Sequence, residues 1–217
     1  MNHSRNLLRQ GASWVTEETE PDPDARREAL GFFCDSVWAF ARSMQRHLWG
    51  FHEDEEAFQR DVREKLDPRE AEGLITARHK PTRANHDLSR AINELPLTYL
   101  RRIEIDKSAI EFANAMGACD RILTSPVPLF YTRHTARFLA LWLLAMPLAL
   151  WDSFAGSWNR IGMIPTVAII SFFFFGIEEL SLVMEEPFTI LPLDKITNGI
   201  GLSCNEHLAW HFESEKD

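Results

Sequence analysis

The chain has 217 residues, of which 25% are charged and 45% hydrophobic, and its formal net charge is −9. These averages are typical of a soluble domain, but residues 135–177 contain only three charged side chains, Arg137, Asp152 and Arg160. So few charges over this length indicate a membrane-embedded segment. No segment carries the dominant positive charge that nucleic-acid binding requires, so nucleic acid is not expected as a partner.

The three cysteines, Cys34, Cys119 and Cys204, are widely separated and form no CxxC pair. This pattern disfavours a disulfide framework or a zinc ribbon and favours three reduced thiols. The first residues lack the apolar stretch of a secretory signal and are poor in the serine and arginine of a transit peptide, so neither is expected in them.

Helical patterns begin at the N-terminus. Apolar residues recur at near-helical spacing within 2–16, and a proline-containing acidic loop over 16–24 follows. Asp24 is expected to cap the next helix, because its carboxylate can accept free backbone amides. That amphipathic helix is predicted over 25–48, where apolar residues recur every three or four positions.

Shorter helices are predicted over 52–96, with starts at Asp67-Pro68 and Lys80-Pro81, because proline fits the first helical turn. A longer helix is predicted from Ile105 to Leu123, and the prolines of 125–128 end it. No segment has a convincing strand pattern, so the predicted fold class is all-α.

Two apolar runs, Phe138–Trp151 and Ile161–Ile177, are joined by a short link over 152–160. Extended backward to Tyr131, the first run reaches the ~20 residues needed to cross a bilayer. They predict a two-helix transmembrane hairpin, and tryptophans at both ends of the link are typical of a membrane interface. The alternative, a buried hairpin in a soluble helical protein, would need more surrounding protein than this chain supplies.

Three segments are therefore predicted: 1–134 as a cytosol-side helical region or bundle, 135–177 as the transmembrane hairpin, and 178–217 as an acidic cytosol-side tail and helix. Arg121, Arg133 and Arg137 precede the first apolar run, whereas Arg160 in the link is offset by an aspartate. The positive-inside rule places both flanking segments on the cytosol-like side.

Two sequence blocks, Cys119–His134 and Gly176–Leu193, resemble the entry to the third and the exit from the fourth membrane helix of bestrophin-like anion channels. His3–Gln10 resembles the stretch after that family's second membrane helix, and the likeness is to the bacterial, fungal, plant and algal branch. The resemblance implies a homopentameric chloride or bicarbonate channel with about four membrane helices per subunit. Met1 falls after the first two, so this chain is expected to lack them, and a non-conducting membrane scaffold or auxiliary subunit is the alternative.

The resemblance also implies a pore constriction on the cytosol side at Ser125 or Val127, where the alternative is a plain helix-breaking turn. A ring of small side chains can set how much water an anion must lose. Calcium binding of the animal kind is not expected, because only Asp194 follows Pro187-Phe188, whereas Ca²⁺ takes six to eight oxygen ligands.

Four acids follow the second apolar run at helical spacing, and they are expected to face water or pair with arginines rather than gate the pore: Glu178, Glu179, Glu185 and Glu186. His207 and His211 have a spacing that suits zinc, but no third ligand is evident nearby, so an ordinary polar helix face is preferred. No metal or cofactor is predicted. Nucleophile-elbow, P-loop and dinucleotide motifs are absent from the sequence, so an enzyme is not expected.

The predicted partners are inorganic anions, membrane lipid and further copies of the chain. The predicted location is an integral, multi-pass membrane protein. The resemblance places it in a plastid or thylakoid membrane if the source is photosynthetic, and otherwise in the cell membrane.

Overall fold

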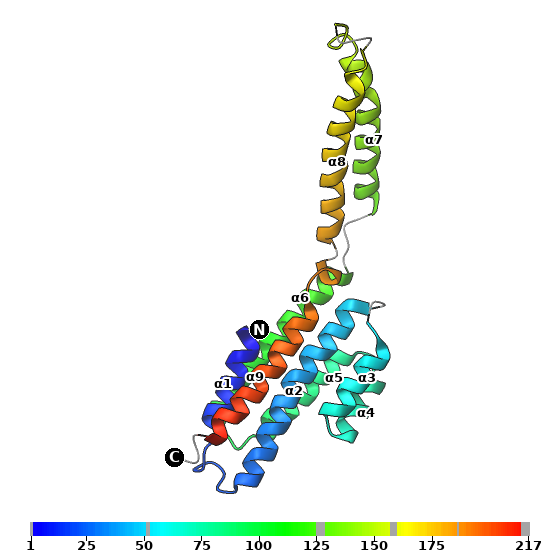
Figure 1. Ribbon diagram of the computed structural model, residues 1–217. Helices are drawn as coiled ribbons and strands as arrows, with labels where there is room; N and C mark the ends of the chain where they lie inside the picture. The colour runs from blue at the N-terminus through cyan, green and yellow to red at the C-terminus, as the bar shows by residue number, and fades with distance from the viewer. Residues whose placement is uncertain (1, 51–52, 125–128, 157–159, 186, 214–217) are drawn as a thin grey trace. The chain divides into compact units, whose positions relative to one another are not determined.

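The computed structural model describes residues 2–50, 53–124, 129–156, 160–185 and 187–213, and within them the fold is all-α without strands, as predicted. The chain forms two compact units, Met1–Asp120 with Phe188–Asp217, and Arg121–Pro187 (Figure 1). The helices are α1 (Asn2–Trp14), α2 (Pro23–Trp49), α3 (Glu55–Lys65), α4 (Pro68–Thr76), α5 (Lys80–Glu94), α6 (Tyr99–Thr124), α7 (Leu129–Leu150), α8 (Met163–Glu185) and α9 (Leu193–Glu213), with a short 3₁₀ turn, η3 (Pro187–Thr189).

The longest helix, α2, begins one residue after its cap. Asp22 is the N-cap and its carboxylate accepts a hydrogen bond from the backbone N–H of Asp24, so the expectation that Asp24 is the cap was wrong. Pro23 explains the difference, because proline fits the first helical position, where no partner for its missing N–H is needed. The predicted starts of α4 and α5 at Pro68 and Lys80 are confirmed.

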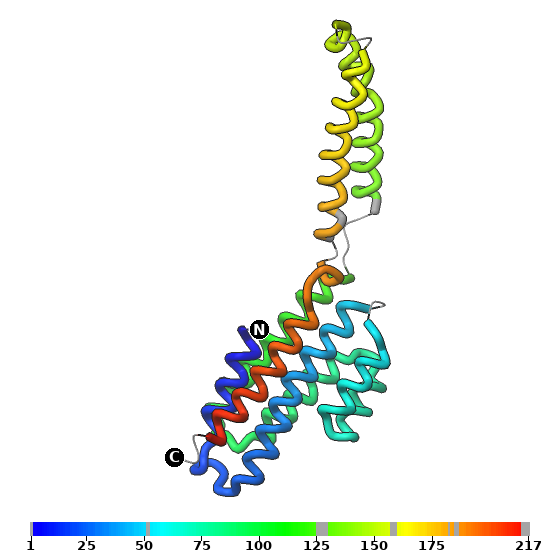
Figure 2. Tube along the Cα trace, in the orientation of Figure 1, coloured from blue at the N-terminus to red at the C-terminus, as the bar shows by residue number. Residues whose placement is uncertain are grey.

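Helix α2 is the centre of the first unit. It packs against α5 and α9, and α1 packs against α9, and these helices run side by side in Figure 2. Phe33 and Val37 of α2 are fully buried, as are Leu7 of α1 and Leu88 of α5. Each such side chain stabilises the fold by about 1.5–3 kcal/mol relative to an exposed one, so these packed faces position the polar groups of the unit.

Helix α9 joins the C-terminal part of the chain to the first unit. Ile200 and Cys204 are buried, and the Cys204 thiol donates to the Cys34 carbonyl at 3.4 Å. A Cβ added at Gly201 would lie 3.1 Å from the Trp38 ring, so glycine lets α9 approach α2 closely. Large parts of the predicted segments 1–134 and 178–217 therefore fold together.

Helix α6 begins at Tyr99, six residues before the predicted start, so the stretch 100–105 is helical. One face is buried through Ile105 and Phe112, and the Phe112 and Phe40 rings lie 4.8 Å apart. Tyr99 and Leu100 are about three-quarters exposed. Helix α6 therefore has one face packed on its own unit and large apolar side chains on another.

The second unit is a hairpin of α7 and α8, which pack against each other, and the rings of Trp142 and Phe174 meet edge to face at 5.1 Å. Within α8, Met163–Ser181 has a mean hydropathy of 1.7 and none of it is buried. It is the one helix among the described residues that is long and apolar enough by composition to cross a membrane. The role of α7, which contains Arg133 and Arg137, as a second span stays a prediction.

Candidate functional site

An open, mainly apolar groove of about 330 Å³ lies between α7 and α8. Phe138 and Leu139 line it from α7, and Phe174 and Ile177 line it from α8. Glu178 contributes a carboxylate to its wall. Glu178 is half-buried there, and Glu178 and Glu179 are the two predicted acids whose side chains the structure describes.

The structure describes the side chains of only some of the other predicted acids. Glu179 is exposed on α8, and Glu185 is the last residue of that helix. The side chain of Glu185 and the whole of Glu186 lie outside the described residues. Pairing of these acids with arginine stays a prediction.

The predicted constriction residues, Ser125 and Val127, also lie outside the described residues. Helix α6 ends before them at Thr124, and α7 begins after them at Leu129. The proline-rich segment therefore connects two helices of 26 and 22 residues, and the predicted end of α6 is confirmed within one residue.

A buried ion-pair network lies in the first unit. The Arg42 guanidinium donates to Glu53 at 2.6 Å and to Asp61 at 2.9 Å. The Arg42 and Glu53 side chains are only 6% and 4% exposed. Glu53 precedes α3 and Asp61 lies within it, so the two ion pairs hold α3 and the residues before it against α2. Removing one partner of the buried Arg42–Glu53 pair would leave an uncompensated charge.

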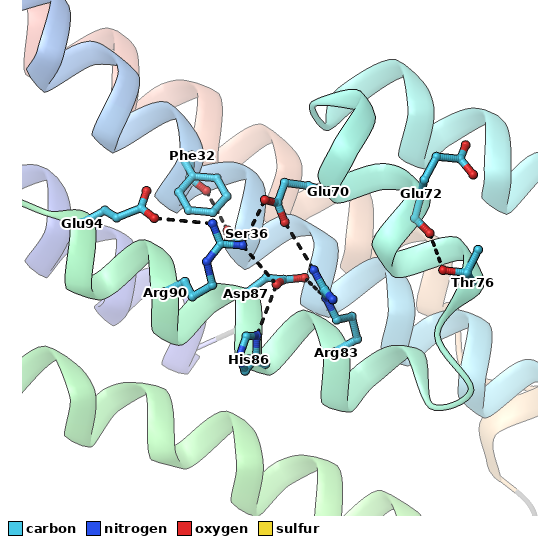
Figure 3. Close-up of polar contacts among 10 residues, drawn as sticks. All are labelled: Phe32, Ser36, Glu70, Glu72, Thr76, Arg83, His86, Asp87, Arg90 and Glu94. Carbon is cyan, nitrogen blue, oxygen red and sulfur yellow. Dashed lines mark hydrogen bonds and ion pairs between the residues drawn. The ribbon is translucent and has the colours of Figure 1, made fainter.

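A second network joins α4 to α5. Figure 3 shows Glu70 of α4 facing Arg83 and Arg90 of α5, at 3.7 and 3.0 Å, with Asp87 between the two guanidinium groups. Hydrogen bonds to Asp87 and Glu70 raise the pKa of Arg83 and Arg90 respectively. Arg90 also lies over the Phe32 ring of α2 at 5.7 Å. These contacts hold α4, α5 and α2 together, so we interpret the network as structural.

A cluster of two histidines and one aspartate lies elsewhere in the first unit. His47 near the end of α2 donates from Nε2 to the Asp120 carboxylate of α6 at 2.7 Å. His79, the N-cap of α5, brings its own Nε2 to 4.0 Å from the same carboxylate. The sequence pattern does not reveal this cluster, because its members are 32 and 41 residues apart along the chain. Only knowledge that α2, α5 and α6 meet in the fold would have identified these three residues as neighbours.

The two histidines singled out from the sequence have separate environments on α9. His211 donates from Nδ1 to the Ala12 carbonyl at 2.8 Å. His207 packs edge-on against the Trp210 ring at 5.2 Å, and burial lowers its pKa. Helical spacing alone therefore did not identify the histidines that the fold gathers with a carboxylate.

Comparison with known proteins gives a consistent result. Residues 1–206 match the family model described as bacterial/fungal bestrophin protein. The chain is 31% identical over 147 residues, 68% of its length, to the voltage-dependent chloride channel 1 of Arabidopsis thaliana chloroplasts. It is 28% identical over 211 residues, 91% of its length, to a voltage-dependent anion channel-forming protein of Nostoc. These alignments cover 35% and 62% of the two relatives, and both relatives are named as channels, not as enzymes.

The fold is also that of solved bestrophin homologues. Crystal structures of two single-substitution variants of a Klebsiella pneumoniae bestrophin homologue superpose with TM-scores of 0.77 and 0.78 at 23% identity. The superpositions cover 95% and 96% of this chain and 73% and 74% of those chains.

The helical bundle and the apolar hairpin form an all-α fold, and its likeness to the solved bestrophin homologues makes it that of a membrane protein. The match over residues 1–206 makes the family specific: the chain belongs to the bacterial/fungal bestrophins. The resemblance noted from the sequence blocks is thereby confirmed. The chain spans about a third of the length of its plant relative.

Proposed function

We propose that this chain is a subunit of an anion channel that lets chloride or bicarbonate cross a membrane passively. The observation that carries the proposal is the match to the bestrophin family over residues 1–206, together with relatives that are named as chloride or anion channels. A passive channel offers an ion a path that replaces part of its hydration shell.

The proposed topology has two membrane-spanning helices, α7 and α8, with both flanking segments on the cytosol-like side. Helix α7 has 22 residues, and at about 1.5 Å per residue it reaches the ~30 Å of a bilayer core. The packing of α9 against α1 and α2 supports the same-side arrangement, because one folded unit cannot be divided by a bilayer. The proposed location is a plastid or thylakoid membrane in a photosynthetic source, and otherwise the cell membrane.

The proposed assembly is a homo-oligomer, a pentamer by likeness to the family, embedded in lipid. The exposed apolar face of α6 supports contact with a second copy, since Tyr99, Leu100 and Ile110 are 77%, 74% and 51% exposed. Leu100→Asp should lower the particle mass in detergent, whereas Asn205→Asp, which adds the same charge at an exposed polar position of α9, should not. Equal particle mass for both variants and the wild type would contradict this interface.

The proposed constriction is Ser125 or Val127. A narrow ring of small side chains makes passage depend on dehydration, so iodide and thiocyanate should pass more easily than the more strongly hydrated chloride. Shortening the ring residue should increase flux and flatten this preference, because the ion then keeps more of its water.

The test is anion flux into liposomes that contain the purified chain, compared among chloride, iodide and thiocyanate. Val127→Ala and Ser125→Ala are measured beside Val183→Ala, which removes the same two methyl groups as Val127→Ala at an exposed position of α8. We expect flux above that of empty liposomes, and altered selectivity in one or both of the first two variants alone. Flux with unchanged selectivity would refute the constriction, and absence of flux would refute the channel.

A further inference from the structure

We propose that His47, His79 and Asp120 bind one divalent transition-metal ion of the zinc class. The three side chains come from α2, the start of α5 and α6, and each offers one ligand atom. These three atoms lie within 4.8 Å of one another. The proposal concerns metal binding and stability of the first unit, and it does not depend on the channel function.

The distances are close to those that a metal requires. Zinc lies about 2.0–2.2 Å from histidine nitrogen and carboxylate oxygen, so two ligands of a tetrahedral site are about 3.3 Å apart. Asp120 oxygens lie 2.7 Å from His47 Nε2 and 4.0 Å from His79 Nε2. These two distances are to different oxygens of Asp120, and the first must open and the second must close by less than an ångström each. The histidine ligand atoms lie no more than 4.8 Å apart, so they must close by up to about 1.5 Å. Side-chain torsions can supply movements of this size. The two rings are already tilted by 60° with centroids 4.7 Å apart, so both can turn an edge toward one point.

A neighbouring hydroxyl holds the His79 ring. Nδ1 of His79 lies 2.7 Å from Thr82 Oγ1 and accepts a hydrogen bond from the Thr82 backbone N–H at 3.3 Å. When Nε2 binds a metal, Nδ1 carries the proton and donates it to the Thr82 hydroxyl, as is usual for metal-bound histidine. The 3.3 Å hydrogen bond from the Thr82 backbone N–H to Nδ1 is then lost, and the 2.7 Å contact with the Thr82 hydroxyl orients the ring.

The ligand set selects the class of metal. Imidazole ligands suit zinc, nickel, copper and iron, whereas calcium and magnesium prefer sites made of oxygen. The His47, Asp120 and His79 side chains are 26%, 32% and 40% exposed. This partial exposure gives an ion a path from solvent and leaves room for water to complete its coordination.

A bound metal would cross-link three helices at the boundary of the first unit, whose first segment ends at Asp120. Because the unfolded chain does not hold these three ligands together, the binding free energy adds to the stability of the fold. The melting temperature should therefore rise with metal concentration. At 100 times the dissociation constant, the rise should be about 5–10 °C for a chain of this size.

The experiment uses the full chain in detergent, without a polyhistidine tag and stripped with a chelator. Zinc chloride is titrated by calorimetry, cobalt is used to read the visible absorption of a tetrahedral site, and melting is followed with each metal. We expect one saturable site per chain and a visible cobalt band. His79→Ala and Asp120→Asn should each weaken zinc binding at least tenfold and remove most of the melting shift. Thr82→Val should weaken binding about tenfold or more without removing the site.

The matched control is His86→Ala, which removes an imidazole from the same helix as His79 at a position 66% exposed. It should bind zinc as the wild type does. If Asp120→Asn does not fold by circular dichroism, His79→Gln replaces it, because His79 is the most exposed of the three ligands. Absence of saturable zinc binding by the wild type, or equal affinity in the wild type and the ligand variants, would overturn the proposal.

Discussion

Gly11→Ala should destabilise the first unit, although alanine is the better helix former. Gly11 is buried in α1, and a Cβ built there would lie 2.4 Å from Cε1 of the Phe33 ring. Phe33 is fully buried, so the ring cannot move into solvent. Helices α1 and α2 must therefore separate, or the core must repack around the ring.

The size of the effect follows from two opposing terms. Alanine gains about 1 kcal/mol over glycine inside a helix, and overpacking a filled core costs about 1–3 kcal/mol, sometimes more. We expect a net loss of about 1–2 kcal/mol, which lowers the melting temperature by about 2–8 °C for a chain of this size. Gly31→Ala in α2 is the matched control, because nothing lies within 4 Å of a Cβ there. It should raise stability by up to about 1 kcal/mol.

The assay is thermal and urea unfolding of the purified chain in detergent, followed by tryptophan fluorescence. Phe33→Leu removes the ring edge that the new methyl meets, so the double variant with Gly11→Ala should lose at least about 0.5 kcal/mol less than the two single losses combined. If Gly11→Ala is as stable as Gly31→Ala, the close approach of α1 to the Phe33 ring is wrong.

Further predictions concern the same unit. Burial raises the pKa of Asp35 from 3.8 to about 6, so the native state binds this proton more tightly and loses stability as pH rises from about 4 to 6. The free energy of unfolding of Asp35→Asn in urea at pH 7.5 should therefore exceed that of the wild type by about 1–2 kcal/mol, a value reduced because Asp35 is partly exposed. The difference should be smaller at pH 4.5, and a pH-independent difference would contradict this. A maleimide should label half-buried Cys119 in the native chain. It should label Cys34 and Cys204 only after denaturation, because these two thiols are buried and the hydrogen bond with Cys204 raises the pKa of Cys34. Equal labelling rates for the three cysteines would refute the packing of α9. Arg42→Met should cost about 3–5 kcal/mol in unfolding, because Glu53 is left charged and buried; a loss below about 1 kcal/mol would show that the pair is exposed to water.

The sequence by itself determined the features that depend on neighbouring residues. The prolines of Asp67-Pro68 and Lys80-Pro81 marked helix starts, because proline geometry acts within one turn. The charge-poor segment 135–177 indicated the hairpin, since apolar length is visible without tertiary contacts. The local signals for α2 were less exact: both Asp22 and Asp24 can cap, and the position of Pro23 decided between them.

The tertiary structure decided which distant residues meet. The sequence spacing of His207 and His211 suggested a metal pair, but the fold places a carboxylate beside His47 and His79, whose positions on α2 and α5 depend on how those helices pack. It also decided that α9 completes the core with α1 and α2, and that Gly11 lies against Phe33. Contacts of this kind depend on how whole helix faces pack against each other. The same apolar pattern is compatible with several packing registers, so the pattern alone does not say which distant residues meet.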